Sequence, residues 1–466
     1  MCKEFTAVIA KDLNLSRRSF IASAAGAALF AKDAFARRIT PPAATTPISP
    51  QDRTFLEDYS KRCFRYFWEQ VNEHTGIVMD RARMDGSSTG GNVGSSAATG
   101  FGLTALCIGA EHGWISHEQA RDRALRTLAY YWGHAFHDHG WFYHFTDAST
   151  GARRLNSEIS SIDTALFLAG VLTVAEYFPK DARIRSFAKQ IFERVDFRWM
   201  LNGDPLILSH GVMPGSGFLP SRWSAYSEAS ILYLLAIGSP RHGIPSDSWY
   251  AWQRPEVRYQ QWRFISGGPL FTHQYSHAWV DFRHQTDGDP SDHDYFENSR
   301  IATYAHRDFC ISLQSKYSDY GPNMWGLTVS DSPRGYMNWG GTVDFGNTNG
   351  TLVPCAAAGS VMFDPDICLP VLRQMHEVYG SKVYGRYGFS DAFNPNWDNK
   401  KLWVNQDVIG IDVGISLLSM ENALNGNVWR WFMRNPYIQT AMERAGFQLT
   451  TPGRHVIKLK TTTKKA

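Results

Sequence analysis

Cysteine is scarce in this sequence, and the cysteines it has are far apart. The chain has six cysteines in 466 residues, and no two of them form a CxxC pair. This spacing excludes a zinc knuckle and a dense disulfide framework. Cys2 lies in a segment that we expect to be removed. The other five are expected to be buried free thiols, with one bridge as the alternative: Cys63, Cys107, Cys310, Cys355 and Cys368.

Several catalytic and membrane signatures are also missing. No apolar run after the N-terminal region is long enough to cross a bilayer. The sequence has no HExxH motif of zinc proteases, and its GSSTG at 86–90 lies in a glycine-rich loop rather than in the strand-to-helix elbow of serine hydrolases. The segment GFGLTA at 100–105 follows no predicted strand, so it does not indicate a nucleotide-binding loop. Four histidines near one another match no zinc spacing: His134, His137, His139 and His144. We therefore expect neither a metal nor a cofactor.

Positive charge is concentrated at the two ends of the chain. The net charge is +3, but residues 1–38 carry +4, residues 451–466 carry +5, and residues 51–450 carry −6. A mildly acidic body lacks the basic stripe that binds phosphate backbones, so we expect no nucleic-acid partner. The basic tail, residues 448–466, is predicted to be a solvated and poorly ordered end.

The N-terminus carries an export signal. The sequence SRRSF at 16–20 precedes the short apolar run IASAAGAALFA, and AFA at 34–36 offers a small-residue cleavage site. This pattern predicts a twin-arginine signal peptide over residues 1–36, followed by a Pro- and Thr-rich linker over residues 37–50. We expect a soluble periplasmic or secreted protein that is not inserted in the membrane after cleavage.

Helix-start signals occur after the linker. Ser49 and Pro50 offer an N-cap followed by a first-turn proline, and Ser116 with Gln119 forms a capping box. These signals predict helices that begin at residues 50 and 117.

Apolar and amphipathic helices alternate along residues 51–447. Segments 161–172 and 223–238 are apolar on nearly all sides, whereas 181–198 is apolar on one face. Such alternation fits two concentric rings, because inner helices are covered on both sides and outer ones on one side. Residues 240–290 are interpreted as long and irregular. We predict one all-α toroidal domain with little strand and with its site on the loops at one rim.

Four carboxylates stand at the entrances of apolar helices: Glu158 and Asp163 in SEISSIDTALFLAG, Glu228 in YSEAS and Asp412 in GIDVGI. One such residue is ordinarily a cap or a partner of the helix dipole. Four of them should converge on one cavity, and glycoside hydrolysis needs one protonated and one ionised carboxyl group. Five helical residues would turn Glu158 and Asp163 about 140° apart. Both can face one bond only if Glu158 lies in the loop before the helix that contains Asp163. We therefore expect Asp163 to contact sugar hydroxyls or to influence a neighbouring group in the cavity.

Aromatic residues are abundant, at 14% of the chain with 16 Trp and 20 Tyr. Their flat apolar faces suit stacking on sugar rings, and core packing is the alternative for each of them. The candidate substrate-binding residues combine aromatic and polar side chains: Tyr226, His273, Asp281, Arg283, Trp325 and Trp403.

Five ordered segments carry a family resemblance: SEISSIDTALFLAG, WSAYSEASILYLLAIGSP, PLFTHQYSHAWVDFR, WGLTVSDSPRGY and GIDVGISLLSMENA. Together they resemble the glucoamylase-like family, which belongs with glycoside hydrolase family 144, the bacterial endo-β-1,2-glucanases. The resemblance runs from residue 55 to residue 447. It implies an (α/α)6 barrel without a metal that acts on a β-glucan polysaccharide or oligosaccharide. Separately, we expect the protein to be a monomer.

The resemblance also implies a reaction and residue roles. The reaction would be endo-acting, inverting hydrolysis of linear or cyclic β-1,2-glucan to short sophoro-oligosaccharides. Glu228 would be the general acid and Asp412 the base, with Glu158 and Asp163 at acidic positions of the site. The family often reads GIDQGP where this chain has GIDVGI at 410–415, so the surroundings of Asp412 differ.

Three rival functions stay open at this point. A glycan-binding protein could keep the barrel and lose turnover. An enzyme of the same fold could act from chain ends or transfer glycosyl groups. A polysaccharide lyase on a similar toroid would need a Tyr/His pair and a basic groove, which the acidic body of this chain disfavours.

Overall fold

Mainly apolar helices form the inner ring of an (α/α)6 toroid, which confirms the predicted fold class. In the described part of the chain the inner helices are α4 (Ser96–Glu111), α6 (Ser161–Tyr177), α8 (Ser230–Gly238), α10 (Phe271–Trp279), α12 (Pro354–Ala358) and α15 (Gly410–Asn425). Every residue of α8 and of α10 is buried, because these helices are covered on all sides.

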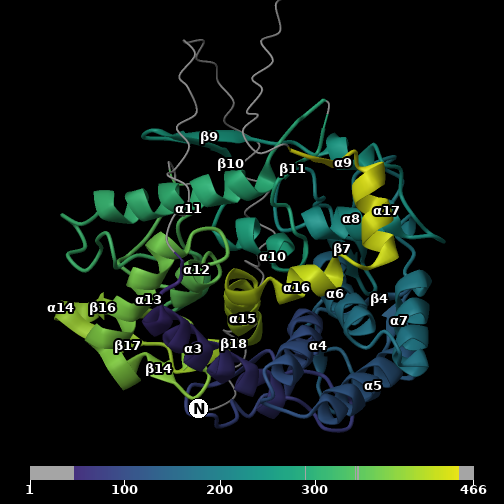
Figure 1. Cartoon of the computed structure of the whole chain (residues 1–466), viewed down its shortest axis with the longest axis horizontal. Coiled ribbons are helices and arrows are strands. Elements are labelled where there is room, and N and C mark those ends of the chain that lie inside the picture. Colours follow the sequence, from purple (N-terminus) through teal and green to yellow (C-terminus); the bar gives the residue numbers. More distant parts are fainter. Residues whose placement is uncertain (1–46, 289, 342, 344–345, 451–466) are drawn as a thin grey trace, which may run out of the picture.

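Amphipathic helices form the outer layer: α3 (Pro50–Glu69), α5 (His117–Gly133), α7 (Ala182–Arg194), α11 (Tyr295–Ser312), α13 (Pro365–Tyr379) and α17 (Pro436–Arg444). Figure 1 shows α5 and α7 outside α4 and α6, and the C-terminal α17 beside α8. The predicted helix starts are confirmed: Ser49 caps α3, and Ser116 with Gln119 forms the capping box of α5.

The computed structural model describes residues 47–450 apart from residues 289, 342, 344 and 345. The predicted signal peptide, residues 1–36, lies outside the described residues, as do most of the linker and of the tail. Within them, no helix has the length and apolar character needed to cross a membrane. The five cysteines after Cys2 are buried free thiols, as expected.

Short antiparallel strands in the loops are more numerous than the sequence suggested. The pairs are β1 (Arg81–Arg83) with β18 (Asp407–Ile409), β2 (Val93–Ser95) with β5 (Phe145–Asp147), β3 (His137–Asp138) with β4 (Trp141–Phe142), β9 (Glu256–Tyr259) with β10 (Trp262–Ile265), β11 (Gln285–Thr286) with β19 (Gln448–Leu449), β12 (Val329–Ser332) with β13 (Gly335–Asn338), β14 (Tyr384–Gly385) with β15 (Gly388–Phe389), and β16 (Phe393–Asn396) with β17 (Lys401–Val404). A three-stranded sheet joins β6 (Ile159–Ser160), β7 (Gly211–Met213) and β8 (Gly217–Phe218).

Two boundaries differ from the sequence interpretation. Residues 240–290 contain the inner helix α10, which polar side chains such as His273, Gln274 and His277 hid from a search for apolar runs. The ordered chain also extends past residue 447, because β19 pairs with β11 through backbone hydrogen bonds. Residues 448–450 of the predicted tail thus have a described structure, and its other residues lie outside the described part of the chain.

The C-terminal ends of the inner helices meet at one short segment, residues 427–437, which contains α16 (Asn427–Phe432). Glu111 at the end of α4 is 3.7 Å from Arg430, and the carbonyl of Glu176 near the end of α6 accepts from Arg434. Gly238 at the end of α8 lies against the carbonyl of Tyr437. This segment closes one rim, so the N-terminal ends of the inner helices face the opposite rim.

Glycine allows α4 and α6 to cross at backbone contact. A Cβ on Gly170 would lie 2.1 Å from the carbonyl oxygen of Gly100, and a Cβ on Gly100 would lie 2.2 Å from the carbonyl of Leu166. No side chain fits between two backbones at this spacing. The crossing fixes where the first turn of α6, with Asp163, sits beside α4.

We predict that Gly170→Ala destabilises the fold by pushing α6 away from α4. Overpacking of this kind costs about 1–3 kcal/mol of unfolding free energy, measurable by urea denaturation. Gly133→Ala is the matched control, because Gly133 also lies in a helix but has open space around its added Cβ. The control should be neutral or slightly stabilising, and equal destabilisation by both substitutions would contradict the packing argument.

Candidate active site

Glu228 lies in the turn that leads into α8 and is 1% exposed. Ser276 on α10 holds this turn. Its hydroxyl donates to the carbonyl of Glu228 at 2.7 Å and accepts from the backbone N–H of Ile231 at 2.9 Å. One buried hydroxyl thus fixes both the Glu228 backbone and the first turn of α8.

Tyr226 and His273 lie behind this turn and point toward the outer helix α11. The hydroxyl of Tyr226 lies 3.3 Å from Nδ1 of His273 and 3.4 Å from Oγ of Ser299 on α11, and its ring stacks on Tyr295. Burial raises the pKa of Tyr226 to about 12 and lowers the pKa of His273 well below its usual value, with His306 and His277 adding to the latter shift. The expectation of direct sugar contact is revised: these two side chains pack in the core and support the turn of Glu228.

Glu158 and Asp163 converge on His144. Helix α6 begins at Ser161, so Glu158 lies before the helix, the condition under which both carboxylates can face one point. Nδ1 of His144 is 3.2 Å from Oε1 of Glu158, and Nε2 is 3.4 Å from Oδ1 of Asp163. Ser160 caps the helix and donates to Oδ2 of Asp163 at 2.5 Å. In the sequence His144 is only one of four histidines without a zinc spacing, and no local motif links it to Glu158.

The same three residues offer ligand atoms within 4.8 Å of one another. One histidine and two carboxylates could hold a divalent cation. The observed contacts also fit a histidine placed between two carboxylates, since Nδ1 of His144 hydrogen-bonds Glu158 and Nε2 lies within ion-pair distance of Asp163. The sequence predicts no metal here.

Asp412 lies in the first turn of α15 and is 9% exposed. It shares a cavity with Asp391, a residue of the loop between β15 and β16 that the sequence analysis missed. The Cys355 thiol of α12 hydrogen-bonds Asp412, and burial, Asp412 and Asp391 together raise the pKa of this thiol well above its usual value. Asp412 thus stands in a buried acidic pocket at the N-terminal rim.

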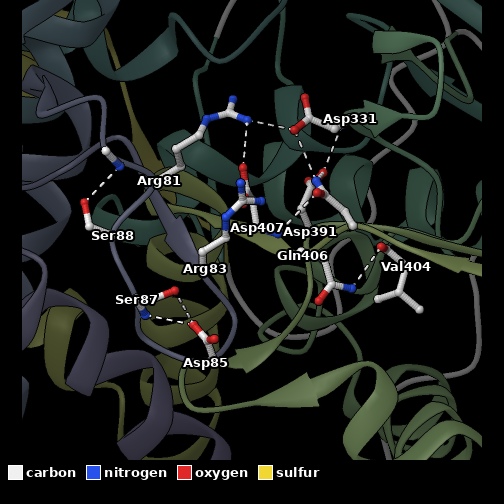
Figure 2. A network of polar contacts seen from close by, with 12 residues as sticks. Arg81, Arg83, Asp85, Ser87, Ser88, Asp331, Asp391, Val404, Gln406 and Asp407 are labelled. Carbon is white, nitrogen blue, oxygen red and sulfur yellow. Dashed lines mark hydrogen bonds and ion pairs between the residues drawn. The ribbon is translucent and has the colours of Figure 1, made fainter. Parts of the chain in front are cut away.

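A network of charges lies next to Asp391, one of the residues that line that pocket (Figure 2). Arg81 on β1 lies 2.8 Å from Asp331 on β12 and 3.6 Å from Asp407 on β18, and Arg83 lies 2.6 Å from Asp407. Asp391 lies beside Asp331 within the same network. The segments β1 and β18 are more than 300 residues apart in sequence and meet here, so no local motif in the sequence indicates the network.

The two tryptophans predicted to bind sugar lie in different environments. Trp325 is 0% exposed, so its ring is packed on both faces and the sugar-stacking expectation is revised to core packing. Trp403 on β17 is half-buried, so part of its side chain is accessible. Trp397, which the sequence analysis did not single out, is also half-buried and lies 5.5 Å from the guanidinium of Arg334.

Asp281 and Arg283 lie at the C-terminal rim of the toroid, opposite the rim that holds the carboxylates. They follow the C-terminus of α10 and form an ion pair at 2.8 Å with each other. The guanidinium of Arg283 stacks on Trp429 of α16, in the segment that closes the C-terminal rim. Helix α15 is about 24 Å long and separates this rim from Asp412, so the expected sugar contact by these two residues is corrected to a structural ion pair.

We predict that Ser276→Ala lowers activity by misplacing Glu228. Loss of the hydroxyl leaves the N–H of Ile231 without its partner, which costs about 1–3 kcal/mol of unfolding free energy. A shift of the Glu228 turn should lower kcat by about 10- to 100-fold, with a smaller change in KM. Ser60→Ala is the control, since the buried Ser60 hydroxyl has only a weak contact with sulfur. Full kcat in Ser276→Ala would contradict this role.

Comparisons with known proteins agree with the geometry. Residues 220–436 match the family model described as "Putative glucoamylase". An exo β-1,2-glucooligosaccharide sophorohydrolase from Parabacteroides distasonis is 27% identical over 442 residues, covering 86% of this chain and 59% of that protein. The chain thus spans less than two thirds of this relative.

Solved structures have the same fold over most of the chain. The endo-β-1,2-glucanase of Chitinophaga pinensis, in complex with sophorotriose and glucose, has a TM-score of 0.77 at 27% identity and covers 85% of this chain and 98% of its own. A β-1,2-glucanase from Parabacteroides distasonis has a TM-score of 0.77 at 25% identity and covers 86% of this chain and 61% of its own. The predicted resemblance to the glucoamylase-like family is therefore confirmed, and the chain has the (α/α)6 toroid of these structures.

Proposed function

We propose that this protein is a glycoside hydrolase that cleaves β-1,2-glucan, linear or cyclic, to short sophoro-oligosaccharides. The observation that carries the proposal is the gathering of buried carboxylates at one rim, where Asp163, Glu228 and Asp412 each stand at the start of an inner helix. The relatives that are named as acting on β-1,2-linked glucans support the substrate class.

Glu228 acts as the general acid and Asp412 as the base. Asp412 accepts a proton from water as the water oxygen attacks the anomeric carbon, and Glu228 gives its proton to the departing glycosidic oxygen. In chain order α8 and α15 are three inner helices apart, so the two carboxyl groups approach the ring centre from opposite sides. Opposite approach leaves room for a water beside the sugar, which favours inversion over retention.

The remaining acidic pair binds the sugar. Glu158 and Asp163, held by His144, present oxygens that accept hydrogen bonds from sugar hydroxyls. Trp403 at the rim offers an apolar face for a glucose ring farther along the chain. These contacts would hold the substrate without a metal or a cofactor.

Endo action is the preferred mode. The chain aligns with nearly the whole of the endo-acting Chitinophaga pinensis structure, whereas it spans 59% of the exo-acting relative. The parts of the exo enzyme that this chain does not cover are candidates for restricting access to chain ends.

Export supports an extracytoplasmic substrate. The twin-arginine motif at residues 16–20 and the cleavage site at residues 34–36 favour a periplasmic or secreted enzyme. We infer that the mature protein acts there as a monomer.

The proposal is tested by incubating the protein with β-1,2-glucan and measuring new reducing ends, with β-1,3-glucan, β-1,4-glucan and alginate as comparisons. We expect cleavage of β-1,2-glucan alone, with the α-anomer of the product first seen by NMR. Binding of β-1,2-glucan without new reducing ends would instead identify a glycan-binding protein, and unsaturated products from alginate would identify a lyase.

We predict that Glu228→Gln lowers kcat by at least about 10²-fold while the protein still binds the glucan, because glutamine cannot donate the proton. Glu421→Gln is the matched control. Glu421 is also 1% exposed on an inner helix, but it lies near the opposite end of α15 and bonds His112. The control should retain activity; near-normal turnover by Glu228→Gln would remove Glu228 as the acid.

A further inference from the structure

Asp391 is a buried carboxyl group with two oxygens in different environments. The residue is 3% exposed. Its Oδ2 accepts from the backbone N–H of Asp331 and from the side-chain amide of Asn405, both at 2.9 Å. Its backbone N–H donates to the carbonyl of Asp407 at 3.0 Å. These bonds fix the orientation of the carboxyl group and leave Oδ1 to point elsewhere.

Oδ1 of Asp391 is buried and has no hydrogen-bond partner in the described protein. A buried carboxyl oxygen without a partner is costly, so it calls for a proton, a neighbour or a ligand. Asp391 and Asp412 line the same small cavity of about 10 Å³, which has room for about one water molecule. The unsatisfied oxygen of Asp391 and the proposed base therefore belong to residues that line one cavity.

The charges around Asp391 are mainly negative. Burial raises the pKa of Asp391 well above its usual value, and Asp331 and Asp412 add to this shift. Arg81 pairs with Asp331, and no ion pair between Arg81 and Asp391 is present among the described residues. The titratable and charged groups that face Asp391 or its cavity are Tyr59 of α3, Arg81 of β1, Asp331 of β12, Cys355 of α12, Tyr387, Asp407 of β18 and Asp412 of α15.

We propose that Asp391 is a positioning residue for Asp412, acting as a neutral carboxylic acid whose Oδ1 hydroxyl donates across the shared cavity toward the Asp412 carboxylate. The proposal rests on the role of Asp412 as the base. A neutral donor stabilises the ionised form of Asp412 and fixes its orientation, whereas a second negative charge would oppose ionisation. Asp391 keeps its proton throughout the reaction, and the proton taken from water goes to Asp412.

The test compares Asp391→Asn with Asp391→Ala. Asparagine reproduces the neutral acid, because its oxygen can accept the two hydrogen bonds of Oδ2 and its amide can donate into the cavity. We expect Asp391→Asn to keep kcat and the pH profile close to those of the wild type. Asp391→Ala should lower kcat by about 10- to 100-fold and move the acidic limb of kcat/KM to higher pH, because Asp412 loses a donor to its charged form.

The outcome expected for an ionised Asp391 differs in the direction of the pH shift. If Asp391 is ionised, Asp391→Asn removes a negative charge beside Asp412 and moves the acidic limb to lower pH, which would overturn the proposal. Asp364→Asn is the control for loss of a buried carboxylate elsewhere, since Asp364 is 0% exposed and pairs with Arg300. It should lower the thermal midpoint and leave the pH profile unchanged.

Infrared spectroscopy tests the protonation of Asp391 without turnover. At neutral pH the wild type should show a carboxylic-acid carbonyl band that is absent from Asp391→Asn, and no difference between the two would overturn the proposal. This measurement stays decisive if Asp391→Ala fails to fold. A wild-type protein that does not cleave β-1,2-glucan would refute the proposed function. A wild-type protein that cleaves the glucan but lacks this infrared band would refute only the neutral, protonated state of Asp391.

Discussion

The shared direction of the inner helices is the constraint on which the site depends. Their C-terminal ends are gathered by residues 427–437, so their N-terminal ends meet at the other rim. Each N-terminus carries about half a positive charge from aligned peptide dipoles. Such ends repel one another unless negative groups lie between them, and carboxylates at helix starts supply those groups. The architecture therefore both requires acidic residues at this rim and concentrates them there.

Different supports hold the individual carboxylates in place. Glu228 depends on a hydroxyl from the neighbouring helix α10, Asp163 on its own cap and His144, and Asp412 on a pocket built from loops and α12. Because each support comes from another part of the chain, the spacing of the carboxylates is a property of the whole toroid. A change in helix packing remote from the chemistry, such as at the α4 and α6 crossing, is then transmitted to the site.

Most of the aromatic content serves packing. Trp141, Trp249, Trp279 and Trp325 are wholly buried, and Tyr226 stacks within the core. Trp403 on β17 and Trp397, which begins the short helix between β16 and β17, are partly exposed and could contact sugar rings. A toroid of this size has two layers of helices to join, and large flat side chains fill the wedge-shaped spaces between them.

The sequence by itself determined the helical architecture, the helix caps at Ser49 and Ser116, and the acidic residues at helix entrances. These are local properties, because periodicity and capping act over a few residues. Only the tertiary structure decided which polar residues belong to the site. The tertiary structure places Asp281, Arg283 and Trp325 outside the site. It places His144, Asp331 and Asp391 in or beside the site. The physical reason is that burial and charge neighbours depend on contacts between segments hundreds of residues apart, such as Arg81 with Asp331 and Asp407, which no local pattern encodes.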